Sequence, residues 1–145
     1  MSTLNFKIKS QTEKLSIVRD FITEAARNFG FDDESAGNIA LAVDEACTNI
    51  IKHAYENRPD REIDIRVQMN KQIFEVIVTH QGKLFDPRLF KSPDIQEYIA
   101  HPRRGGLGIR IMKLLMDNVD YKILPDKKCE VHLIKKLPSE AIKSR

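Results

Sequence analysis

A long amphipathic stretch in the first half of the chain most constrains the fold. Apolar residues recur every three or four positions from Asp32 or Asp33 to Tyr55, which predicts one helix whose buried face holds Ile39, Val43, Ala46, Ile50 and Ala54. The two aspartates favour the start of this helix because carboxylates interact well with free helix amides. A second amphipathic pattern, over residues 12–29, ends at Gly30. Two such helices need an apolar layer on which to pack.

Alternating apolar and polar residues predict the strands of that layer. The pattern appears at residues 4–9, as an edge strand, at residues 63–79, as a hairpin divided at Asn70 and Lys71, and at residues 119–124 and 130–137. A further helix face is formed by Ile109, Met112, Leu115 and Met116. The element order predicts an α+β fold in which helices cover one face of a mixed, mainly antiparallel sheet, a two-layer α/β sandwich.

Length and composition limit the class of protein. The 145 residues suit one domain, and no apolar run approaches the roughly 18 residues of a membrane span. The chain lacks a secretory signal and has two cysteines, Cys47 and Cys129, so we expect a cytoplasmic protein. The net charge of +3 comes from the last 25 residues, where Tyr121 is the one aromatic residue. That pattern disfavours direct nucleic-acid binding, and we expect no membrane partner.

Three polar residues follow a spacing of four on the long predicted helix. Glu45, Asn49 and His53 would form one row beside the apolar face. Taken alone, such a row is also typical of a solvated helix surface. Cys47 lies off this row and is expected in the core.

Two glycine-containing segments could approach a ligand. His80, Gln81 and Gly82 follow a predicted strand, although an ordinary turn has the same composition. The segment from Arg103 to Gly108 opens a predicted helix, where free amides and arginines favour phosphate, although a hinge would also contain glycines. Between them lies a long loop, expected to act as a lid over about residues 83–106, with a short helix near residues 93–100.

The joint order of these motifs resembles the ATP-binding fold of histidine kinases, gyrase and Hsp90, also called the Bergerat fold. The stretch from Leu41 to Tyr55 is similar to the family's N-box. The stretch from Gly105 to Ile109, with Leu114 to Asp117 after it, is similar to the second glycine box. The closest resemblance, over essentially the whole chain, is to the anti-sigma factor serine/threonine kinases.

This resemblance implies a role for each motif residue. Glu45 would accept the proton of an attacking serine hydroxyl, and Asn49 would hold a Mg²⁺ ion that bridges the phosphates of ATP. His53 would support the N-box helix. The remaining nucleotide contacts would come from Gly82, Arg103 or Arg104, Gly106, Leu107 and Gly108. The implied partners are a sigma factor or similar effector, an anti-anti-sigma antagonist of the STAS type, and a second copy of the chain in a homodimer.

Two positions depart from the family pattern, and both concern the base. His80 stands where the family has an aspartate that accepts from the adenine amino group, and Cys129 stands where a threonine helps to hold the base. A neutral imidazole can accept one hydrogen bond in one tautomer, and a thiol replaces a hydroxyl poorly. The departures indicate either altered base recognition or weakened nucleotide binding. In the second case the chain would be an inactive partner-binding switch module.

Overall fold

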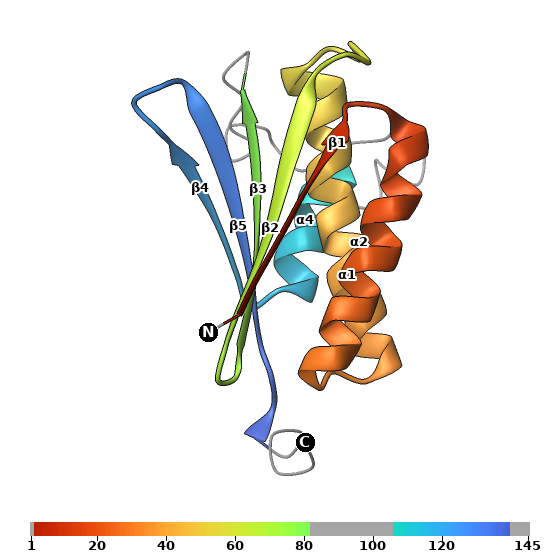
Figure 1. Ribbon diagram of the computed structural model, residues 1–145, viewed down its shortest axis with the longest axis vertical. Coiled ribbons are helices and arrows are strands. Elements are labelled where there is room, and N and C mark those ends of the chain that lie inside the picture. Colours follow the sequence, from red (N-terminus) through yellow and green to blue (C-terminus); the bar gives the residue numbers. More distant parts are fainter. Residues whose placement is uncertain (1, 82–105, 140–145) are drawn as a thin grey trace.

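The structure, a computed structural model, describes residues 2–81 and 106–139 (Figure 1). The expected short helix near residues 93–100, and all but the last residue of the expected lid, lie outside these ranges. The helical elements are η1 (Thr12–Lys14), α1 (Leu15–Phe29), α2 (Asp33–Asn49), η2 (Ile50–Ala54) and α4 (Gly106–Leu115). The strands are β1 (Ser2–Lys9), β2 (Glu62–Asn70), β3 (Ile73–Gln81), β4 (Asn118–Ile123) and β5 (Lys128–Lys136).

The strands form one five-stranded sheet in the order β1-β2-β3-β5-β4, and each described pairing is antiparallel. Helices α1, α2 and α4 lie on the same face of this sheet (Figure 1). The predicted α+β layer architecture is therefore confirmed, as is the edge position of β1. Lys71 takes a positive φ of 51° at the tight turn between β2 and β3, the turn predicted at Asn70 and Lys71.

The ends of the first two helices follow their sequence signals. Gly30 ends α1 with a φ of 127°, a conformation that side chains disfavour, and its amide donates to the carbonyls of Ala26 and Arg27. Asp32 caps α2, because its side chain accepts a hydrogen bond of 2.7 Å from the Ser35 amide. The same bond lowers the pKa of Asp32.

The second helix differs from its prediction in the last turn. The α-helical part ends at Asn49, and Ile50–Ala54 forms a π-helix closed by a 2.9 Å bond from the Tyr55 amide to the Ile50 carbonyl. A π-turn is wider than an α-turn, and Ile50 and Ile51 within it are both buried. The period of four that would align His53 with Asn49 does not hold across this turn.

The core lies between the helices and one face of the sheet. Phe74 on β3 is fully buried, with its ring centroid 5.8 Å from those of Phe29 and Phe31. Cys47 is fully buried, as predicted, and burial is the main cause that raises the pKa of its thiol. Among the described helices, none is long and apolar enough to cross a membrane.

Candidate functional site

A small cavity is lined by the C-terminal end of α2, the start of η2, the helix α4 and the strands β3, β4 and β5. Its volume is about 10 Å³, room for about one water molecule. The wall combines four apolar and three polar side chains, from Ala46, Asn49, Ile50, His80, Met112, Tyr121 and Val131. The cavity thus brings two predicted site residues, Asn49 and His80, to one place.

Two residues of this wall carry a buried polar atom. Asn49 is 2% exposed and His80 is 3% exposed. Within residues 2–81 and 106–139, neither Asn49 Nδ2 nor His80 Nδ1 has a hydrogen-bond partner. Buried polar atoms in folded proteins are usually hydrogen-bonded, and an unmet one costs about 1–3 kcal/mol. Their convergence on one cavity suits a polar ligand that satisfies both.

The two departures from the family pattern are direct neighbours in the sheet. His80 pairs with Cys129 across β3 and β5, and both side chains are buried on the helix-covered face. Burial lowers the pKa of His80 to about 4, so its imidazole is neutral near pH 7. At this end of the sheet the chain therefore presents an uncharged imidazole beside a thiol.

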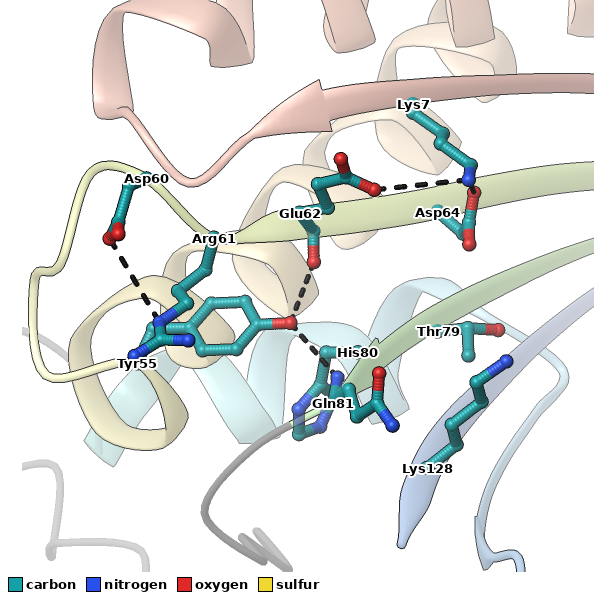
Figure 2. A pocket seen from close by; sticks show the side chains of 10 residues that line it. All are labelled: Lys7, Tyr55, Asp60, Arg61, Glu62, Asp64, Thr79, His80, Gln81 and Lys128. Carbon is teal, nitrogen blue, oxygen red and sulfur yellow. Dashed lines mark hydrogen bonds and ion pairs between the residues drawn. The ribbon is translucent and has the colours of Figure 1, made fainter. Parts of the chain in front are cut away.

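Tyr55 links the end of the π-helix to the strand ends. Its hydroxyl donates to the Glu62 carbonyl at 2.6 Å and accepts from the Gln81 amide at 2.9 Å, and Figure 2 shows both bonds. Its ring meets that of His80 edge-on, with centroids 5.9 Å apart. Burial raises the pKa of Tyr55 above its usual value. Tyr55 thus holds the strand end that carries His80.

His80 also lines a second, larger pocket, whose wall includes Tyr55 and Gln81 (Figure 2). This pocket has a volume of about 470 Å³ and a mostly charged wall. Its carboxylates already have cationic neighbours: Lys7 lies 3.8 Å from Glu62 and 4.0 Å from Asp64, and Arg61 lies 3.9 Å from Asp60. The pocket has no excess of one charge that would select a ligand.

The other predicted site residues have different placements. Glu45 and His53 lie on α2 and η2, and neither lines the small cavity. Burial lowers the pKa of His53. Gly106, Leu107 and Gly108 form the first residues of α4, so the glycine segment does open a helix. Gly82, Arg103 and Arg104 lie outside the described residues.

The sequence did not indicate a site role for Tyr55 or for the cavity residues other than Asn49 and His80. Met112 and Tyr121 line the cavity, and Tyr55 holds the strand that carries His80. The alternation of Val119 and Tyr121 could have placed Tyr121 on the helix-covered face. The role of Tyr55 carried no sequence signal, because it depends on the π-turn.

Comparison with known proteins places the chain in a family. The pattern of the family described as histidine kinase-like ATPase domain matches residues 8–135. The chain belongs to that family. Among curated members, it is 33% identical over 121 residues to the serine-protein kinase RsbW of Bacillus velezensis, covering 80% of this chain and 75% of that one. It is 32% identical to RsbW of Bacillus subtilis with the same coverage. It is 29% identical to RsbW of Bacillus cereus, and that match covers 97% of this chain and 89% of the Bacillus cereus protein.

A solved structure has the same histidine kinase-like ATPase fold. The RsbU and RsbW domains of Rv1364c from Mycobacterium tuberculosis superpose with a TM-score of 0.66 at 14% sequence identity. The match covers 94% of this chain and about a third of that longer chain. The chain is thus an RsbW-like member of the family, as its sequence motifs predict.

Proposed function

We propose that the chain is an ATP-dependent protein serine/threonine kinase that also acts as an anti-sigma factor. The observation that carries this proposal is a cavity lined by both Asn49 and His80, each of which has a buried side-chain nitrogen without a hydrogen-bond partner among the described residues, and by Met112 of α4. The RsbW relatives, all named serine-protein kinases, give independent support. Because the cavity holds only about 10 Å³, nucleotide binding requires one wall to move. The wall formed by Met112 belongs to α4, which packs mainly on α2.

The phosphate groups of ATP would lie between α2 and the start of α4. Asn49 can turn its amide oxygen toward a Mg²⁺ ion, a hard cation that prefers oxygen ligands. The amides of Gly106, Leu107 and Gly108 are at the N-terminus of α4, where free N–H groups favour an anion. Arg103 or Arg104 would add positive charge near the γ-phosphate. Bound Mg-ATP supplies the phosphoryl group for transfer.

Glu45 would act as the base that accepts the serine proton. It lies one turn before Asn49 on α2 and is half-buried. As the serine oxygen bonds to the γ-phosphorus, the bond from that phosphorus to the β,γ-bridging oxygen breaks and ADP leaves. The hydroxyl proton passes to the Glu45 carboxylate. Positioning and charge neutralisation supply most of the rate in such transfers.

The proposed substrate is a serine on an anti-anti-sigma antagonist of the STAS type, and the proposed second partner is a sigma factor or similar effector. The chain would work in the cytoplasm, as a single domain that forms a homodimer. Incubation with Mg-ATP and the cognate antagonist should transfer phosphate to the antagonist. The Glu45→Ala variant should bind Mg-ATP as tightly as the wild type but transfer none. Equal transfer by this variant would refute the role of Glu45.

A second candidate is a partner-binding switch module without turnover. It is favoured by the neighbouring positions of His80 and Cys129, which replace both expected base-binding groups, and by the small volume of the cavity. In that case a folded protein should bind its partner and show no affinity for Mg-ATP even at millimolar concentration. Titration of Mg-ATP separates the two candidates.

A further inference from the structure

The cavity wall has the chemistry of a site for a flat, partly polar ring. Ala46, Ile50, Met112 and Val131 supply apolar surface, while the polar lining residues Asn49, His80 and Tyr121 come from three separate elements. Binding sites for small molecules commonly combine an apolar wall with a few placed polar groups. A nucleobase offers an apolar face to the apolar wall and hydrogen-bonding edges to the polar groups. This step rests on the proposed nucleotide-binding function.

The hydrogen-bonding character of His80 is not fixed by its surroundings. Its Nδ1 is buried, and the residues the structure describes provide no hydrogen bond to the ring that would select a tautomer. A neutral imidazole with the proton on Nε2 accepts at Nδ1, and one with the proton on Nδ1 donates there. A carboxylate at the same position could only accept.

The surrounding residues fix the position of the ring. The backbone of His80 is held in the sheet by its pairing with Ile63 and Cys129. Tyr55 contacts the ring edge-on and bonds the next amide along the strand. Nδ1 can therefore change from acceptor to donor by moving a proton between ring nitrogens, without displacement of the ring.

We propose that this site binds purine nucleotides with either a 6-amino or a 6-oxo group, because His80 can accept from the first and donate to the second. The hydroxyl of Tyr121, on the same wall, also combines a donor with acceptor lone pairs. The described residues that line the cavity thus include no carboxylate that would exclude hypoxanthine or guanine nucleotides from an adenine site. Widening the cavity is needed for both kinds of base, so it affects their relative affinity little.

The test compares ADP with IDP, which lacks the 2-amino group of guanine and so isolates the 6-position. Calorimetric titration of the full chain with each diphosphate and Mg²⁺ should give dissociation constants within about tenfold of each other. If IDP binds more than about tenfold weaker than ADP, the proposal is wrong although nucleotide binding stands. If neither binds at millimolar concentration, the proposed function itself fails, and this inference fails with it.

Two variants sharpen the result. His80→Asp places a carboxylate there, which only accepts hydrogen bonds, so the affinity for IDP should fall about tenfold to a hundredfold relative to the affinity for ADP. Gln81→Asp adds the same charge at the next residue, whose side chain is exposed, and should leave the ratio of the two affinities unchanged. An unchanged ratio in a folded His80→Asp protein would overturn the role of His80. If that variant does not fold, His80→Asn should still bind both nucleotides, since an amide offers a donor and an acceptor, and a strong preference for ADP in it would contradict the proposal.

Discussion

His80 is a buried base whose protonation opposes folding. In the unfolded chain its pKa is near 6.5, whereas burial lowers the pKa in the folded protein to about 4. Between these two values the unfolded state binds more protons than the folded state. Stability from this residue is therefore complete above about pH 6.5 and is lost as the pH falls toward 4.

This linkage predicts a measurable difference between the wild type and His80→Asn. From about pH 7.5 to about pH 4.5 the free energy of unfolding should fall about 2–3 kcal/mol more in the wild type, because asparagine does not titrate. Urea unfolding at several pH values measures the difference. Parallel pH profiles of the two proteins would contradict the buried, neutral state of His80.

The sequence alone predicted part of the site. It assigned His80 and Cys129 to the same role, contact with the base, and the two residues are cross-strand neighbours in the structure. It also placed Cys47 in the core, where it is fully buried. The unpartnered atoms of Asn49 and His80 could not be foreseen, because hydrogen-bond satisfaction depends on side chains from elements distant in sequence.

The π-helix Ile50–Ala54 is the element that joins the site to the sheet. It follows Asn49 directly and is followed by Tyr55, whose hydroxyl hydrogen-bonds the carbonyl of Glu62 and the amide of Gln81. Helical periodicity predicted the full length of this segment, since the apolar residues recur through Ala54. It could not predict the widened turn, because π- and α-turns bury similar residues and differ by one hydrogen-bond step.

Removal of the Tyr55 hydroxyl should loosen this connection. Tyr55→Phe loses both bonds and leaves a part-buried carbonyl and amide unmet, so we expect a loss of about 1–3 kcal/mol in the free energy of unfolding. Ser16→Ala is the matched control, because it also removes a side-chain hydroxyl bonded to a backbone carbonyl, but at an exposed site. Its effect should stay within about 0.5 kcal/mol. Equal unfolding midpoints for the two variants in urea would refute the proposed link.

At the scale of the whole molecule, one face of the sheet carries the described helices and one end of the sheet carries the cavity. The alternation of residues 63–79 and the two amphipathic patterns were enough to predict this layer arrangement. Strand order was not, because β3 pairs with β5 across a gap in sequence that no local pattern spans. That pairing brings His80 and Val131 to the same cavity, and the pairing of β4 with β5 adds Tyr121.

Titration with ATP tests most directly whether the cavity lined by Asn49 is the nucleotide site. Calorimetry on the wild type should show binding that strengthens when Mg²⁺ is added. Asn49→Ala, shown to be folded by circular dichroism, should bind Mg-ATP about tenfold to a hundredfold more weakly and lose the response to Mg²⁺. A folded wild type with no binding at millimolar Mg-ATP, or equal binding by both proteins, would contradict the account.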